Sequence, residues 1–320
     1  MSVMSSTALT SAGQQTRTIA HPDPLLRVMA WELRRFRASR LFWWQALGLF
    51  CFMLLLIWAL RAPDQFGSQI GTQGVTVFVA GTSAWGLLHT LPLILVLLVV
   101  LLPFVTADGV TRDLNRRTHE LLMTTALPTW AYVWGRYLVG LLVSLGLAVL
   151  LLASILGMGV LAHLTIPAYP LPQLDSVLLL WLGMVVPAVF LVSSLSFALS
   201  TLLPRLSMLV KVVVMVAWIL GAVMAPAAYN NTVPPAWYVN WDPTSAITAR
   251  GLLPVYENLF DPLSRTATSA AQLEQTLLAI ENKLPDLAGW FAPHLLLGGL
   301  SLALVLIASL AYKRSRNALR

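Results

Sequence analysis

Six long runs of apolar residues with almost no charge constrain this chain more than any other feature of its sequence. An α-helix needs about 20 mostly apolar residues to cross the hydrocarbon of a bilayer. Helices suit such runs because every backbone N–H and C=O in lipid must find its hydrogen-bond partner within its own segment. We predict an all-α membrane protein with six spans, at residues 41–60, 85–107, 131–156, 177–203, 208–227 and 289–311.

The composition agrees with lipid as the main solvent. Hydrophobic residues make up 58% of the 320 residues and charged residues only 10%, whereas soluble domains carry roughly 25% charged residues. A single cysteine, Cys51, excludes a secreted disulfide scaffold. The net charge of +7 does not predict a nucleic-acid partner, because the basic residues are placed as markers of membrane orientation.

The distribution of the basic residues predicts the topology. If both termini are cytoplasmic, 16 of the 20 basic residues face the cytoplasm, and only Arg61, Arg250, Arg265 and Lys283 lie outside. An even number of spans agrees with this arrangement. We expect an integral protein of a bacterial cytoplasmic (inner) membrane, with residues 1–23 as a flexible cytoplasmic tail and 312–320 as a basic cytoplasmic tail.

Residues 24–40 are predicted to form an amphipathic helix in the cytoplasmic interface, before the first span. Asp23 and Pro24 suit a helix N-cap followed by proline at the first helical position. One face of the helix carries apolar residues, namely Leu25, Leu26, Met29, Leu33 and Phe36. Two interpretations stay open: the helix is a basic anchor for anionic lipid, or its polar face, with Glu32, Arg34 and Arg35, also docks a partner.

The loop between the second and third spans, residues 108–130, has the densest charge in the interior of the chain. Mixed signs exceed what orientation requires, since acidic residues contribute little to topology. Leu121 and Leu122 form an apolar pair surrounded by charges, which is typical of a docking surface. The alternative is a solvated connector with incidental leucines.

The segment between the fifth and sixth spans, residues 228–288, is predicted to be a long extracytoplasmic loop that contains a helix. Residues 230–241 are rich in Asn, Pro and aromatic residues and suggest an irregular lid. Within 268–284, apolar residues recur at helical spacing, at Leu273, Leu277, Ile280 and Leu284. We expect this helix to cover the outer mouth of the bundle.

The span interiors lack the groups that most membrane chemistry requires. Ion coupling needs an acidic residue at mid-depth, a haem bundle needs facing histidines, and the chain has no GxxxxGK[ST] phosphate loop. We therefore expect no catalytic, metal or cofactor site in this chain, and a lipid-modifying enzyme ranks lowest among its functions. Pro92, Pro103 and Pro187 are candidate kinks within the spans.

The layout and one local sequence resemble the permease subunit of type-two ABC transporters, an exporter-type membrane component. The most specific segment is residues 112–142, RDLNRRTHELLMTTALPTWAYVWGRYLVGLL. A similar stretch of that family has a charged run, Thr-x-Glu-Leu-Leu, a Thr-rich turn, Pro, an aromatic residue and Gly-Lys/Arg. The residues that fit these places are Thr118, Glu120, Leu121, Leu122, Thr124, Thr125, Trp130, Gly135 and Arg136. Arg117 and Ala126 stand where the family usually has Gly and Pro.

This resemblance implies a coupling helix within residues 108–130 that docks into a separate cytoplasmic ATPase subunit, with helix 24–40 beside the same subunit. The implied coupling residues are Arg112, Asp113, Arg116, Arg117, Thr118, His119, Glu120, Leu121, Leu122 and Thr125. Two permease chains, identical or homologous, and two ATPase chains would form the working unit, with ATP and Mg²⁺ on the partner subunits. The chain itself is then a permease and not an enzyme.

The uncharged path through the spans suits export of an apolar or amphipathic substrate by such a permease, with membrane lipids as its other contacts. The alternative is a non-transporting membrane scaffold or sensor, whose extracytoplasmic loop binds a ligand and whose inner loop reports to a partner.

Overall fold

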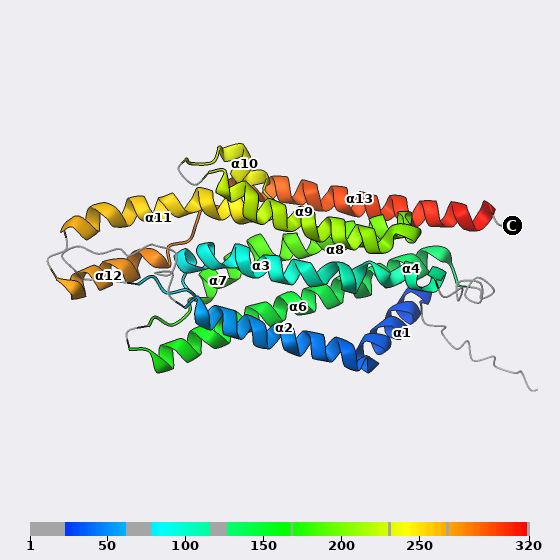
Figure 1. Cartoon of the computed structure of the whole chain (residues 1–320), viewed down its shortest axis with the longest axis horizontal. Coiled ribbons are helices and arrows are strands. Elements are labelled where there is room, and N and C mark those ends of the chain that lie inside the picture. Colours follow the sequence, from blue (N-terminus) through cyan, green and yellow to red (C-terminus); the bar gives the residue numbers. More distant parts are fainter. Residues whose placement is uncertain are drawn as a thin grey trace, which may run out of the picture.

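Long helices that run side by side along one axis dominate the fold (Figure 1). The computed structural model describes residues 23–61, 78–115, 127–167, 169–229, 232–266 and 269–318, and these contain helices but no strand. Six of the helical segments are long and apolar enough to cross a membrane. The prediction of an all-helical chain with six candidate membrane spans is confirmed.

The six candidate spans begin close to the predicted residues. They are α2 (Arg40–Ala59), α3 (Ala84–Thr106), α6 (Thr129–Thr165), the segment made of α7 (Leu174–Leu180), η2 (Trp181–Val185) and α8 (Val186–Leu202), then α9 (Ser207–Ala227) and α13 (Ala288–Ala318). Of these, α6 and α13 run beyond their predicted ends. A short 3₁₀ turn, η3 (Pro204–Leu206), joins α8 to α9. The π-helical η2 comes directly before Pro187 and makes the fourth span irregular in its backbone.

Polar side chains at helix ends explain where several elements start. Asp23 caps α1 (Pro24–Ala38) by accepting a hydrogen bond from the Leu25 amide at 3.0 Å, with Pro24 in the first turn as predicted. Ser39 caps α2 through the Phe42 amide at 3.3 Å, so α1 and α2 meet at one capped corner. These caps satisfy amides that have no partner inside the helix.

The third span, α6, is longer than predicted. It has 37 residues, which at 1.5 Å per residue is about 55 Å and exceeds the thickness of the hydrocarbon core. The apolar run suggested an end at residue 156, but the helix continues to Thr165 because no proline interrupts it before Pro167. In Figure 1 the C-terminal end of α6 extends beyond the adjacent end of α2, on the side opposite α1.

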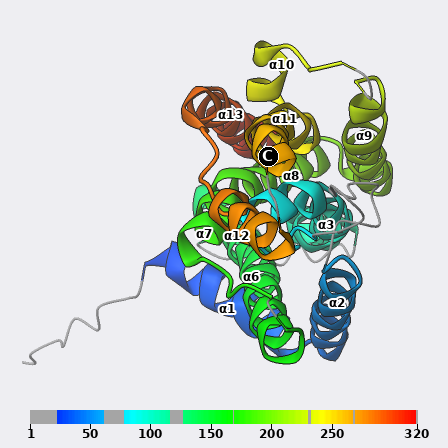
Figure 2. The same cartoon turned by 90° about the vertical axis from the view of Figure 1, so that its left-hand side faces the viewer.

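The spans divide into interior and peripheral helices. About half of the most apolar window is buried in α3 and α6 and in the fourth span, against 22% in α2, in the η3–α9 span and in α13. Seen end-on, α2, α9 and α13 lie at the periphery (Figure 2). The interior helices approach closely because α8 is lined with small side chains, at Ser193, Ser194, Ser196, Ala198 and Ser200. The exposed apolar faces of the peripheral helices suit lipid or another chain.

The segment between α9 and α13 contains three helices where we expected a loop with one. They are α10 (Ala236–Trp241), α11 (Ala246–Thr266) and α12 (Ala270–Glu281). The interpretation of residues 230–241 as irregular is therefore wrong for α10. The 21-residue α11 was not predicted, because Pro254 and Pro262 within it conceal its period. Its buried Tyr256 and Phe260 lie against Trp85 of α3, with ring centroids 5.6 Å and 5.9 Å away.

Candidate functional site

Charged side chains from four helices gather at the end of the bundle that carries α1, α4 (Asp108–Asn115) and the C-terminal part of α13 (Figure 1). The short α4 continues almost directly from α3, and it begins the loop that sequence analysis singled out. We name this group the charged network, and its members are Glu32, Arg35, Asp108, Arg112, Asp113, Arg136 and Lys211.

Arg136 of α6 is a buried member of the charged network, with 2% of its surface exposed. Its guanidinium makes an ion pair with Asp113 and donates a hydrogen bond to the carbonyl of Gly109. The Tyr132 hydroxyl donates to the same carboxylate at 2.8 Å, and the rings of Tyr132 and Trp31 lie 4.7 Å and 5.1 Å from the guanidinium carbon. Arg136 therefore links α4, α6 and α1 at one point.

A second ion pair joins α4 to α9. Lys211 is 6% exposed, and its ammonium lies 2.6 Å from Asp108 and 5.4 Å from the centre of the Phe104 ring. Basic side chains near the ends of membrane spans commonly extend toward water. Arg136 and Lys211 instead turn inward, because Asp113 and Asp108 offer each a partner within the protein.

Helix α1 lies against α6 and brings a buried acid to the charged network. Glu32 is 1% exposed and pairs with Arg35 at 2.6 Å. Burial raises the pKa of Glu32, and the positive charges of Arg136, Arg35 and Arg112 oppose that rise. Close approach of the helices depends on Gly135, since a Cβ there would lie 2.7 Å from a methyl carbon of Val28.

The structure places only part of the predicted site. Of the coupling residues, Arg112 and Asp113 belong to α4, while Arg116, Arg117, Thr118, His119, Glu120, Leu121, Leu122 and Thr125 lie outside the described residues. Of the helix 24–40 residues, Glu32 and Arg35 join the charged network, whereas Arg34 is exposed and donates to the Ala30 carbonyl at 3.3 Å. Pro92 and Pro103 lie inside α3, and Pro187 lies in the first turn of α8.

The sequence patterns did not indicate a role for Tyr132, Trp31 or Lys211, and they did not pair Arg136 with Asp113. The sequence nevertheless contains one signal that points to these charged residues. Arg136 and Lys211 are basic residues inside otherwise apolar helices, and Asp108 and Asp113 directly follow such a helix. Charges in these positions are rare unless they are paired, so the sequence could have marked these four residues as candidates for pairing. Which acid faces which base is decided by the fold.

The opposite end of the bundle has a smaller polar group around Glu281, the last residue of α12. Its carboxylate is 1% exposed and accepts a hydrogen bond from the Ala80 amide at 3.0 Å, just before α3. Burial raises the pKa of Glu281 to about 7, against the lowering effect of the Ala80 amide and the Ser83 hydroxyl. This contact fastens α12 to the start of the second span.

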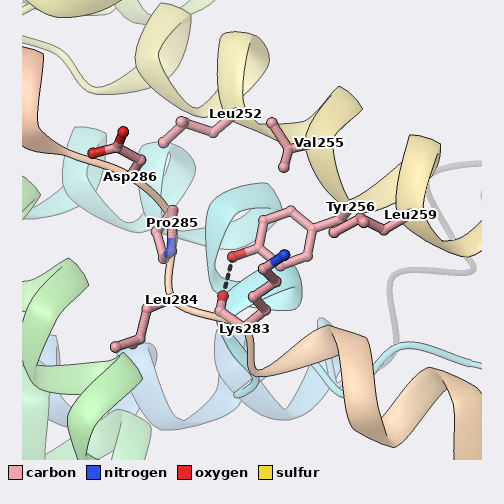
Figure 3. Close-up of a pocket in the computed structure, with 8 residues that line it drawn as sticks. All are labelled: Leu252, Val255, Tyr256, Leu259, Lys283, Leu284, Pro285 and Asp286. Atoms are coloured by element: carbon pink, nitrogen blue, oxygen red, sulfur yellow. Dashed lines mark hydrogen bonds between the residues drawn. The ribbon is translucent and has the colours of Figure 1, made fainter.

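A cavity of about 250 Å³ lies beside this group, between α11 and the chain that joins α12 to α13 (Figure 3). The Tyr256 hydroxyl donates to the Lys283 carbonyl at 2.5 Å across it. The sequence predicted four apolar residues on one face of the helix within 268–284, which is α12 in the structure. Three of them, Leu273, Leu277 and Ile280, are buried, whereas Leu284 is 49% exposed and lines the cavity. Leu284 is therefore outside the packed face, because α12 ends at Glu281.

Histidines and acids do not assemble a metal site in the described part of the chain. His294 is typical: it stacks on Trp290 with ring centroids 3.4 Å apart, and its ring nitrogens lie 3.0 Å and 3.1 Å from the carbonyls of Trp290 and Asp242. Its role is packing. In comparisons with known proteins, no protein-family model, curated protein or solved structure matches the chain.

Proposed function

We propose that this chain is the membrane-spanning permease subunit of an ATP-driven ABC transporter of the exporter type, coupled to separate cytoplasmic ATPase subunits. The observation that carries the proposal is the charged network, because it joins the start of the 108–130 loop to other helices of the bundle. Asp113 is paired with Arg136 of α6, and Asp108 is paired with Lys211 of α9.

An external ATPase requires a rigid connection of this kind between the loop and the spans. Movement of a partner protein that holds the loop reaches the spans only if the loop does not bend independently of them. Removing one partner of a buried ion pair costs about 3–5 kcal/mol, so α4 resists separation from α6. The pairs of Arg136 and Lys211 then transmit a displacement of α4 to two spans at once, and rigid-body rocking of a dimer would follow.

The transport path and the second subunit are part of the same proposal. The peripheral helices α2, α9 and α13 leave apolar faces uncovered, which suits a second permease chain, identical or homologous, together with membrane lipid. Trp181 to Val185 form a π-helical segment just before Pro187, and such segments occur frequently at functional sites. With both termini cytoplasmic, the charged network would face the ATPase.

The test is a pull-down of the tagged full chain in mild detergent, with mass spectrometry of the accompanying proteins and an ATPase assay on the eluate. We expect an ATPase subunit with a phosphate-binding loop at close to one copy per permease chain. Replacing Glu120 and Leu121 by alanine should remove it, whereas Glu257→Ala, an exposed change on α11, should not. A chain that elutes alone, without nucleotide hydrolysis in several detergents, would contradict the proposal.

A specific observation also favours the second candidate function, a membrane scaffold or sensor. The cavity beside α11 has apolar walls and ends in two charged residues, Lys283 and Asp286 (Figure 3), which is the composition of a small-ligand pocket. In that case deleting residues 263–284 would abolish a response to an external ligand and leave ATPase stimulation normal. Loss of stimulation and of transport together would favour the permease.

A further inference from the structure

A second cavity, of about 460 Å³, lies in the corner where α1 turns into α2, against α3, α4 and α6. Its walls are mostly apolar, from Phe36, Phe42, Leu101, Phe104, Val105 and Leu147. Arg35 of α1 and Arg112 of α4 line it, and the polar residues Ser39 and Gln45 line it at the start of α2. The cavity therefore has a basic part at the end of the bundle and an apolar part that extends between the spans.

The basic part carries more positive than negative charge. Within the described ranges, Arg112 makes no ion pair and Arg35 pairs with Glu32 alone. Asp108 also lines the cavity, but Lys211 holds its carboxylate at 2.6 Å. Burial lowers the pKa of Arg35, the charge of Glu32 raises it, and the nearby charge of Arg112 lowers it again. A bound anion would relieve the repulsion between the two like charges of Arg35 and Arg112.

We propose that this cavity binds one anionic phospholipid, with its headgroup phosphate between Arg35 and Arg112 and an acyl chain along the apolar walls. Guanidinium groups suit phosphate because they donate parallel hydrogen bonds to two of its oxygens. The proposal requires only that the chain spans a membrane, and it stands apart from the proposed coupling to an ATPase.

The position of the cavity relative to the membrane favours a lipid over a soluble anion or a protein segment. Trp43 and Trp44 begin the adjacent span and are 56% and 72% exposed, and tryptophan is enriched at the boundary between lipid and water. The exposed apolar side chains of α2 continue away from the corner, at Leu47, Phe52 and Leu55. A soluble phosphate would leave the apolar walls empty, whereas a phospholipid occupies both parts.

The experiment uses the full chain in nanodiscs of phosphatidylcholine with a fraction of photoactivatable phosphatidylglycerol, and maps the cross-linked peptides by mass spectrometry. We expect cross-links within residues 36–46 and 101–108. Native mass spectrometry of the released protein should show one phosphatidylglycerol retained per chain. Free phosphate in excess should not displace it, because phosphate lacks the acyl contact.

Two variants and a matched control decide whether this is a defined site. Arg112→Gln removes one charged donor, which should weaken phosphatidylglycerol retention roughly tenfold. Gln45→Glu is a change of similar shape at an exposed position that adds a repelling charge, and it should reduce retention to a similar extent. Arg34→Gln removes the same charge as Arg112→Gln from the exposed side of α1 and should leave retention unchanged.

Three results would overturn the proposal. Equal loss of lipid in Arg112→Gln and Arg34→Gln would mean that the helix attracts anionic lipid only through its overall charge. Equal cross-linking by a photoactivatable phosphatidylcholine would mean that the basic part of the cavity does not select phosphatidylglycerol over phosphatidylcholine. Cross-links that avoid both peptides in the presence of a co-purified protein would mean that a protein, not a lipid, occupies the corner.

Discussion

The buried ion pair between Arg136 and Asp113 does more than neutralise two charges. Arg136 is 2% exposed, and it also contacts Gly109, Tyr132 and Trp31. Because burying a charge without a partner costs several kcal/mol, every group around Arg136 restricts where α4 and α1 can lie. The same reasoning applies to Glu281 at the opposite end, where a buried carboxylate at the end of α12 accepts a hydrogen bond from the Ala80 amide, just before α3.

Breaking the Arg136–Asp113 ion pair should strongly lower the stability of the folded chain. We expect Asp113→Ala or Arg136→Met to lower the free energy of unfolding by about 3–5 kcal/mol, since each removes one member of a buried ion pair. The double variant should lose clearly less than the sum of the two. Denaturant unfolding of the purified chain measures all three values, and additive losses would show that the pair contributes no coupling energy.

The raised pKa of Glu281 predicts that the attachment of α12 depends on pH. Its pKa is about 7 in the folded chain against a reference value of 4.5. The folded state therefore holds the proton more tightly, and its contribution to stability is full below pH 4.5 and is lost as the pH rises through 7. The loss is on the order of 3 kcal/mol.

The measurement for Glu281 is the thermal unfolding midpoint between pH 4.5 and 8. We expect the wild-type midpoint to fall with rising pH more steeply than that of Glu281→Gln, whose side chain cannot ionise. Glu274→Gln on the same helix, at a partly exposed position, should keep the wild-type slope. Identical slopes in all three proteins would contradict the raised pKa.

At the scale of elements, glycine decides how closely α1 and α6 pack. A Cβ at Gly135 would lie 2.7 Å and 2.9 Å from two carbons of Val28. Real Cβ atoms do not come this close, so α1 would have to move. By contrast, Gly146 in the same helix has no atom within 4 Å of a Cβ placed there. The two positions differ only in what faces them.

Gly135→Ala should therefore loosen α1, and a second change should restore it. We expect faster tryptic cleavage at Arg27 and Arg34 in Gly135→Ala, and near-normal cleavage when Val28→Ala is added, because the alanine removes the carbons that clash. Gly146→Ala should leave cleavage unchanged and raise helix stability by up to about 1 kcal/mol. Failure of Val28→Ala to rescue would place the strain elsewhere.

At the scale of the whole molecule, charge and apolar surface are separated along one axis. The charged network lies at one end, the α10–α12 helices lie at the other, and apolar faces of α2, α9 and α13 surround the middle (Figures 1 and 2). This arrangement matches a molecule whose middle is in lipid and whose two ends face different aqueous compartments.

Labelling from the two sides of the membrane tests this orientation. In a Cys51→Ser background, we expect a membrane-impermeant thiol reagent to reach Gln275→Cys from outside intact cells. The reagent should reach Arg37→Cys only after the membrane is opened. Both positions are exposed in the structure, so neither depends on unfolding. Labelling of both from the same side would exclude the predicted topology.

The sequence alone determined the number, position and helical nature of the six spans, because lipid leaves a long apolar segment no other way to satisfy its backbone. It also predicted the start of α1, since Asp23 and Pro24 act on neighbouring residues. It missed α11, whose Pro254 and Pro262 are tolerated because Tyr256 and Phe260 pack on Trp85. Tertiary structure alone decided that Arg136 and Lys211 turn inward, because their partners Asp113 and Asp108 lie far away in sequence. The sequence determines the charge of a side chain. The direction in which the side chain points depends on which opposite charge the fold places near it.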